Sequence, residues 1–192
     1  MFKFLSIYIH NFLINVIIIK YIINFNGLFQ VTMQGSIKGQ LNMNYSFSFS
    51  LTGFLIVLLP MIPNFFYFLL PNAFSTEKIE NKHLILDIIE HGSQFFYIAL
   101  LIFITTNKNL SMQSLYFVGM VVSLVFYYIL WILLFSGHKN LIILISMAIF
   151  PVIYFILSEI WINNLLSTIP TVIFGVVHVI ITYKDFTSSN LN

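Results

Sequence analysis

Long apolar segments, separated by short polar stretches, dominate the chain from residue 51 onward. Several of them approach the roughly 20 residues that a helix needs to cross the hydrocarbon core of a bilayer. The pattern lacks the alternating short strands that are typical of a transmembrane barrel. We therefore predict an all-α, polytopic transmembrane helical bundle with about five spans: Leu51–Leu70, Leu84–Thr106, Met112–Phe135, Leu141–Ile162 and Leu165–Tyr183.

Proline and aromatic positions add detail to these spans. Pro60 and Pro63 lie inside the first span, where a proline frees a backbone carbonyl and kinks the helix. Tyr127, Tyr128 and Trp131 lie near the end of the third span, as an interfacial aromatic belt does. Because the connectors after the third and fourth spans are very short, we expect the neighbouring helices to pack antiparallel.

The first 42 residues have a different pattern. Their apolar stretch, Phe4–Ile23, is broken by polar residues such as Lys20, and a charge near the middle of a span costs about 2.5–3.5 kcal/mol on insertion scales. The stretch also fits a signal peptide poorly, because no small-residue cleavage site follows the interrupted apolar core. We predict a marginal N-terminal helix and a polar stretch over residues 1–42, and the transmembrane bundle over residues 43–192.

A second hypothesis for residues 1–42 concerns the start of the native protein. The segment Lys38-Gly39-Gln40 can be encoded by AAA-GGA-CAA, which contains a bacterial ribosome-binding sequence, and Met43 follows at about the usual spacing. On this hypothesis Met43 is the native first residue, and the alternative is a real but weak first helix. The mass of the native protein distinguishes the two, since a chain that begins at Met1 rules out the internal start.

Composition supports the membrane class and narrows the chemistry. Hydrophobic residues make up 59% of the chain and charged residues only 7%, whereas a soluble domain carries about 25% charged residues. The absence of cysteine excludes disulfides and thiolate metal sites. A net charge of +2 gives no indication of a nucleic-acid partner, so the expected partners are the lipid bilayer and another membrane protein. The basic residues are all lysine, and Ile, Phe, Asn and Tyr are abundant, which indicates an AT-rich, bacterial genome.

The lysines predict the orientation of the spans. One lysine, Lys108, falls on one side of the predicted membrane, and four fall on the other: Lys78, Lys82, Lys139 and Lys184. Because loops that are rich in lysine stay in the cytoplasm, we expect a multi-pass protein of the cell membrane with a cytoplasmic C-terminus. A start at Met43 then places the N-terminus outside, and a real first helix places it inside.

A polar stripe enters the second span. Its members recur every three or four residues and so share one face of a helix: Glu80, His83, Asp87, Glu90, His91 and Gln94. At a rise of about 1.5 Å per residue, Glu90 and His91 lie about 9–10 Å inside the span. By the same rise, polar groups of three other spans share this layer near the cytoplasmic leaflet: Asn64, Tyr127, Tyr128 and His178.

Ionisable groups inside a membrane are expensive and usually face the bundle interior or water. Glu90, His91 and His178 are therefore the candidate catalytic residues: Glu90 as a proton donor or acceptor, and His178 as its partner or as a metal ligand. Asn64, which follows the proline kink, is a candidate for binding a polar head group or the freed carbonyls. The remaining candidate substrate-binding residues are Gln94 and Tyr127.

A structural interpretation of the same residues stays open. Glu90 and His91 lie only two turns into the span, where long polar side chains reach water and head groups. Histidines and a carboxylate on different helices are a weak metal pattern, and no HExxH spacing occurs, so we predict neither a metal nor a cofactor. For Glu159, which lies beside Trp161 near the outer end of the fourth span, we favour an interfacial role over a catalytic one. Gly175 is interpreted as a helix-packing contact.

Short motifs give the chain a family resemblance. They are Pro60-Met61-Ile62-Pro63-Asn64, then Glu80-Asn81-Lys82 with the acidic helix that runs on to Glu90, and Gly175-Val176-Val177-His178. Over about Thr52 to Lys184, these motifs resemble a group of small, uncharacterised polytopic membrane proteins of low-GC Gram-positive bacteria. The resemblance implies a location in the cell membrane and no particular reaction.

Two functions remain open at the level of sequence. The first is a non-enzymatic integral membrane protein, namely a small transport or accessory component or an immunity-type factor that binds another membrane protein. It rests on the sparse polar content and the absence of a catalytic motif. The second is a membrane-embedded enzyme that acts on a lipid or lipid-linked substrate at the cytoplasmic leaflet, and it rests on the shared depth of Glu90, His91 and His178.

Overall fold

The computed structural model of the protein describes residues 45–69, 83–106 and 110–189. These residues all belong to the second of two compact units, Leu41–Asn192. The predicted N-terminal helix and the Met43 start lie outside them. In chain order the elements are β1 (Tyr45–Phe47), α2 (Leu51–Leu69), α3 (Leu84–Phe103), β2 (Ile104–Thr106), α4 (Leu115–Phe135), α5 (Leu141–Trp161) and α6 (Leu165–Ser189).

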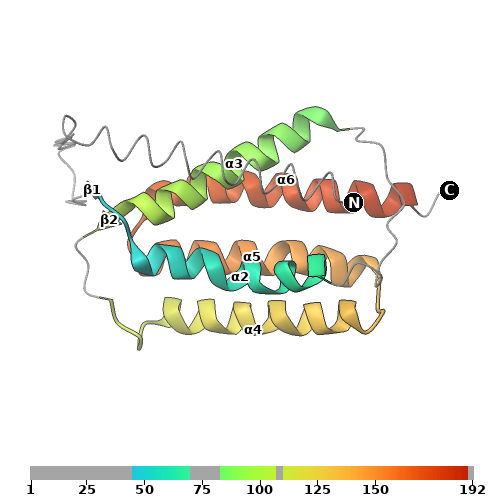
Figure 1. Ribbon diagram of the computed structural model, residues 1–192, viewed down its shortest axis with the longest axis horizontal. Helices are drawn as coiled ribbons and strands as arrows, with labels where there is room; N and C mark the ends of the chain where they lie inside the picture. The colour runs from blue at the N-terminus through green and yellow to red at the C-terminus, as the bar shows by residue number, and fades with distance from the viewer. Residues whose placement is uncertain (1–44, 70–82, 107–109, 190–192) are drawn as a thin grey trace. The chain divides into compact units, whose positions relative to one another are not determined.

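The helices pack side by side as a bundle. Helices α4, α5 and α6 are successive antiparallel neighbours, and α3 packs against α6 (Figure 1). Helix α2 contacts α3, α4 and α5. The turns are tight, with Gly137 at φ 89° between α4 and α5, and Asn163 at φ 61° between α5 and α6. Glycine and asparagine are the residues that tolerate this left-handed backbone. The predicted antiparallel packing of these neighbours is confirmed.

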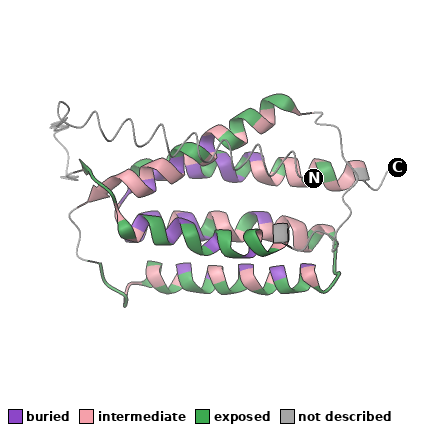
Figure 2. Ribbon diagram, viewed as in Figure 1, coloured by how far each residue is buried: buried purple, intermediate pink, exposed green. Residues whose placement is uncertain are grey.

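Four of the helices, α3, α4, α5 and α6, are long and apolar enough to cross a membrane. Helix α2 carries a shorter apolar stretch, Leu51–Tyr67. The outward faces of the helices are exposed (Figure 2), and they carry large apolar side chains such as Phe65, Ile85, Leu115 and Ile142. Contiguous apolar surface of this kind suits lipid and not water. The predicted fold class, an all-α polytopic transmembrane helical bundle, is confirmed.

The second predicted span is too long by three residues. Helix α3 ends at Phe103, and Ile104–Thr106 forms β2, which pairs antiparallel with β1. The segment is β-branched throughout, which favours a strand. The hydroxyls of Ser46 and Ser48 each lie 2.7 Å from the Thr105 hydroxyl and reinforce the pairing. The prediction that the helix continues to the end of this segment is wrong, because its strand partner lies far away in the sequence.

Two further helix boundaries differ from the prediction. Helix α4 begins at Leu115 and not at Met112, because the residues before it form a turn in which Ser114 is extended. Helix α6 continues beyond Tyr183 to Ser189. Its last turns are polar, and the Thr187 hydroxyl donates to the Tyr183 carbonyl at 2.9 Å. A polar continuation of an apolar helix is invisible to a search for apolar spans.

The predicted aromatic belt of α4 is in fact part of the core. Tyr127 and Trp131 are buried, and they pack with Leu134 and Tyr67. Small and aromatic residues recur along the inward face of α4 every three or four positions, which places this face against α5 and α2. The interfacial assignment of Tyr127 and Trp131 is wrong, because aromatic residues near a span end are as suitable for a packed interface as for the head-group region.

Pro60 removes one hydrogen bond from the middle of α2. A helical carbonyl accepts from the N–H four residues later, so Pro60 leaves the Ile56 carbonyl without its helical partner. The Tyr154 hydroxyl of α5 donates to this carbonyl at 3.0 Å, and Tyr154 is among the most deeply buried residues of the core. The side chain of one helix thus replaces the backbone donor that another helix lacks.

Pro63 has the same effect one turn later. It leaves the Leu59 carbonyl free, and the Tyr128 hydroxyl of α4 donates to that carbonyl at 2.7 Å. The expectation that the prolines free backbone carbonyls is confirmed by both contacts. Together the two tyrosines tie α2 to α5 and to α4.

Two glycines allow close approach between helices. A Cβ on Gly53 of α2 would lie 1.9 Å from the Leu101 carbonyl oxygen of α3, which a real side chain cannot do. A Cβ on Gly175 of α6 would lie 2.6 Å from Val152 Cγ1 of α5. The interpretation of Gly175 as a helix-packing contact is therefore confirmed.

We predict that Tyr154→Phe lowers the free energy of unfolding by about 1–3 kcal/mol, because the Ile56 carbonyl is left buried and unpaired. In a Pro60→Ala background, the restored backbone N–H binds the Ile56 carbonyl. There Tyr154→Phe should lower the free energy of unfolding markedly less. The measurement is a double-mutant cycle of unfolding in detergent micelles. Tyr183→Phe is the control, since the Tyr183 side chain is exposed. If Tyr154→Phe lowers the free energy of unfolding equally in both backgrounds, the Tyr154 hydroxyl does not replace the donor that Pro60 lacks.

Candidate functional site

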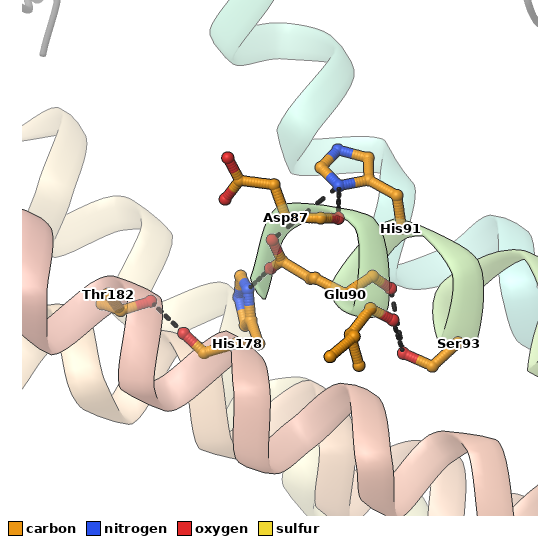
Figure 3. Close-up of polar contacts among 7 residues, drawn as sticks. Asp87, Glu90, His91, Ser93, His178 and Thr182 are labelled. Atoms are coloured by element: carbon orange, nitrogen blue, oxygen red, sulfur yellow. Dashed lines mark hydrogen bonds and ion pairs between the residues drawn. The ribbon is translucent and has the colours of Figure 1, made fainter. Parts of the chain in front are cut away.

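The polar stripe of α3 points in two directions. Glu90 and His91 are adjacent, so their side chains leave the helix about 100° apart. The Glu90 side chain is 12% exposed and points toward α6, whereas the His91 side chain is 56% exposed (Figure 3). His91 Nδ1 lies 2.7 Å from the Asp87 carbonyl oxygen and 4.0 Å from Glu90 Oε2. Of the two neighbours, Glu90 is the one that enters the helix interface.

Glu90 meets His178 of α6. Its Oε1 is hydrogen-bonded and ion-paired to His178 Nδ1 (Figure 3). The His178 side chain is 34% exposed, so one edge of the pair remains accessible. The structure therefore brings together two of the predicted candidate residues, which are 88 positions apart in the sequence.

Neighbouring residues hold the pair in place. Phe174, one turn earlier on α6, stacks on the His178 ring with centroids 5.0 Å apart and planes 15° apart. Thr182, one turn later, donates to the His178 carbonyl at 2.8 Å. On α3, the buried Ser93 hydroxyl donates to the Glu90 carbonyl at 3.0 Å. The imidazole is thus fixed flat against an aromatic ring with Nδ1 toward the carboxylate.

This geometry suits the binding and release of a proton. The Glu90 carboxylate and the His178 imidazole are both groups that can accept a proton. The pair joins two helices, so its protonation also affects how strongly they are held together. Among the described residues, no three His, Asp or Glu side chains lie close enough to hold a metal ion together.

Asn64 and Tyr127 form a second pair, in another interface. The Asn64 amide of α2 donates to the Pro60 carbonyl at 3.3 Å and to the Tyr127 hydroxyl of α4 at 3.4 Å. The Pro60 carbonyl is not one that the prolines free, because its helical donor is the backbone N–H of Asn64, so a role of Asn64 in binding a head group or the freed carbonyls stays a prediction. Within the described part of the chain, no hydrogen bond or ion pair joins Asn64 or Tyr127 to the Glu90–His178 pair.

The last candidate, Gln94, lies half-buried on α3 beside the buried Tyr97. The six residues predicted as site residues thus occupy separate places. Glu90 is joined to His178 and lies 4.0 Å from His91, Asn64 is joined to Tyr127, and Gln94 lies beside Tyr97.

Glu159 is buried and not interfacial. It lies in the last turn of α5, is 0% exposed, and accepts a hydrogen bond from the Thr171 hydroxyl of α6 at 2.5 Å. Trp161, which was taken to mark the interface, is buried as well, and its Nε1 donates to the Ser111 carbonyl at 2.9 Å. The interfacial role expected for Glu159 is wrong, because the chain turns back at Asn163 and α6 covers this end of α5.

Sequence reasoning missed the residues around Glu159. Small polar residues recur every three or four positions over the first turns of α6: Asn164, Ser167, Thr168 and Thr171. Asn164, Ser167 and Thr171 are completely buried. A stripe of small polar residues that follows a carboxylate after one tight turn is the signal that identifies this cluster.

No protein-family model, no curated protein and no solved structure matches this chain. The resemblance to small membrane proteins of low-GC Gram-positive bacteria therefore stays a prediction. Any function has to follow from the residues themselves and the way in which the helices place them.

We predict that Glu90→Gln and His178→Asn each destabilise the protein, and that the double variant loses less than the sum of the two. The reason is that the first substitution already removes the charge-assisted hydrogen bond. The measurement is a double-mutant cycle of thermal unfolding in detergent at a pH below 6, where the free imidazole is charged. His138→Asn is the matched control, because this histidine is exposed and lies in the α4–α5 turn. Strictly additive losses would show that the two side chains do not interact.

Proposed function

We propose that the protein is a small, non-enzymatic transport component of a bacterial cell membrane, in which the Glu90–His178 pair takes up and releases a proton. The observation that carries this proposal is the contact of a carboxylate with an imidazole across α3 and α6. Both helices are long and apolar enough to cross a membrane. Glu90 lies about 9 Å from the first residue of α3, which is deep enough to be costly without a function.

The accessible edge of His178 gives the pair a route to protons. A fully enclosed pair would exchange slowly with water, and a fully exposed pair would not couple the two helices. When the imidazole is charged, the contact is an ion pair, and when it is neutral, the attraction weakens. The N-terminal end of α3 leans away from α6 beyond this contact (Figure 1). Proton release would therefore loosen the point at which the two helices separate.

The lysines support a cytoplasmic position for this end of the bundle. Lys139 precedes α5, and Lys184 lies in the last turns of α6, at the end that also carries Glu90 and His178. In the sequence, Lys78 belongs to the segment that joins α2 to α3 at the same end. By the positive-inside rule we propose that the C-terminus is cytoplasmic, with lipid and a second membrane protein as the partners.

A membrane enzyme is the second candidate function. The partial exposure of His178 beside Glu90 favours it, because a carboxylate that orients an imidazole is a common arrangement for general base catalysis. The substrate would be a lipid or lipid-linked molecule of the cytoplasmic leaflet. His91, the third residue predicted for this site, lies 4.0 Å from Glu90 Oε2 and is mostly exposed, so it flanks the pair on its open side.

We predict that the purified protein in liposomes conducts protons. An imposed potassium diffusion potential should acidify vesicles that contain a trapped pH-sensitive dye faster than it acidifies protein-free vesicles. Glu90→Gln and His178→Asn should each lower the rate at least about tenfold, because each removes one proton-accepting group.

The matched control is His138→Asn, which changes an exposed histidine in the α4–α5 turn at the same end of the bundle. It should leave proton flux unchanged. If the wild type is no faster than empty vesicles, the transport proposal is wrong. Conversion of an added lipid, detected by mass spectrometry and lost in Glu90→Gln, would establish the enzyme instead.

Orientation is tested separately by fusions at the C-terminus. A fluorescent protein that folds only in the cytoplasm should fluoresce there, and alkaline phosphatase, which is active only outside, should stay inactive. Exchanging Lys139 and Lys184 for glutamine should reduce this bias, whereas exchanging both for arginine, which keeps the charge, should leave it unchanged. The reverse pattern of reporter activity would place the C-terminus outside.

A further inference from the structure

The cluster around Glu159 contains buried oxygen atoms that lack hydrogen-bond partners. They are Glu159 Oε2, Asn164 Oδ1 and Thr168 Oγ1, and each is inaccessible to solvent. Glu159 and Asn164 are themselves 0% exposed. The hydroxyls of Thr171, Thr168 and Ser167 all lie close enough to interact with the Glu159 carboxylate, so the Thr168 hydroxyl can donate to it, and the Asn164 amide oxygen is the acceptor that stays without a donor.

The orientation of Asn164 is fixed by its other contacts. Its amide nitrogen donates to the Leu100 carbonyl at 2.9 Å and to the Ile104 carbonyl at 3.2 Å, at the end of α3. Both N–H groups of the amide are therefore used. If the amide were flipped, its oxygen would face the two carbonyl oxygens, and all three atoms are acceptors. The amide oxygen is left as an acceptor without a donor.

Thr171 lacks one hydrogen atom for the contacts that it makes. Its hydroxyl lies 2.5 Å from Glu159 Oε1 and 2.9 Å from the Ser167 carbonyl, and both are acceptors when Glu159 is ionised. A hydroxyl has a single hydrogen to donate. The nearby Ser167 hydroxyl is already used, because it donates to the Asn164 carbonyl at 2.7 Å. The cluster thus holds a buried carboxylate that only hydroxyl groups solvate, with no positive charge beside it and with one amide oxygen without a donor.

No basic side chain of the described residues balances Glu159. The described parts of α2 and α4, which pack near α5, contain no Asp, Glu, Lys or His, and Tyr97 of α3 is the titratable group that interacts electrostatically with this carboxylate. All other described Asp, Glu, Lys and His residues lie in or just before the first half of α3, in the α4–α5 turn, or in the second half of α6: His83, Asp87, Glu90, His91, His138, Lys139, His178, Lys184 and Asp185.

We propose that Glu159, with the Asn164 amide oxygen and the hydroxyls of Thr168 and Thr171, forms a buried binding site for one monovalent cation, either Na⁺ or a proton. An isolated buried carboxylate is too costly to persist, and a single positive charge neutralises it. Carboxylate, amide and hydroxyl oxygens are the ligands that hard cations prefer. A proton on Glu159 would equally supply the missing hydrogen, since Glu159 could then donate to Thr171 and Thr171 to the Ser167 carbonyl.

The test is cation-dependent unfolding of the purified full chain in detergent micelles. If Na⁺ is the ligand, the unfolding temperature rises and saturates as NaCl replaces choline chloride at constant ionic strength and pH. If the ligand is a proton, Na⁺ has no effect, and the unfolding temperature falls with rising pH because deprotonation leaves a buried charge. In either case Glu159→Gln, which is neutral at every pH, should abolish the response. Fluorescence of Trp161, in a Trp131→Phe background, reports the same binding locally.

Two further variants keep the test decisive if Glu159→Gln does not fold. Thr171→Val keeps the shape of the side chain but removes the hydroxyl, and it should shift the response to higher Na⁺ or lower pH. Ser158→Ala is the matched control, because the equally buried Ser158 hydroxyl is occupied by the Tyr154 carbonyl at 2.6 Å. A wild type that responds to neither cation, or a response that survives both Glu159→Gln and Thr171→Val, overturns the proposal. The pH series is run in a His178→Asn background, which separates the response of Glu159 from that of the Glu90–His178 pair.

Discussion

A backbone carbonyl inside a bilayer has no water to bind, so each carbonyl that a helix leaves free must find a donor in the protein. The prolines Pro60 and Pro63 create two such carbonyls in α2, and the hydroxyls of Tyr154 and Tyr128 supply the donors from α5 and α4. The Asn164 amide, in the turn before α6, donates to the carbonyls of Leu100 and Ile104 at the end of α3. The two tyrosines thus join α2 to its neighbours α5 and α4, and the Asn164 amide joins the start of α6 to the end of α3.

The sequence was sufficient to predict the spans and the meeting of Glu90 with His178. Apolar length sets where a helix enters the membrane, and a constant rise per residue then sets the depth of each polar group. Depth alone does not say which helices are neighbours. Asn64 and Tyr127 share the layer of the Glu90–His178 pair, yet they meet in the interface of α2 with α4. Lateral contacts depend on the packing of whole helix faces, which local periodicity does not encode.

Two failures of the sequence analysis have a common cause, namely contacts between segments that are distant along the chain. The end of the second span became a strand because β1, more than fifty residues earlier, pairs with it. Glu159 and Trp161 were assigned to the membrane interface because they stand at a span end, but the tight turn at Asn163 folds the start of α6 over them. In both places the local pattern was interpreted correctly as the end of an apolar segment, and the tertiary fold decided what that end is buried against.

Helix α6 is the element that connects the two ionisable sites. Thr171 contacts Glu159 and His178 contacts Glu90, and since the two α6 residues are seven positions apart they lie on nearly one face, about 10 Å from each other. Between them, Gly175 presses α6 against Val152 of α5 without room for a side chain. The two ionisable sites therefore lie along one helix, on either side of its close contact with α5.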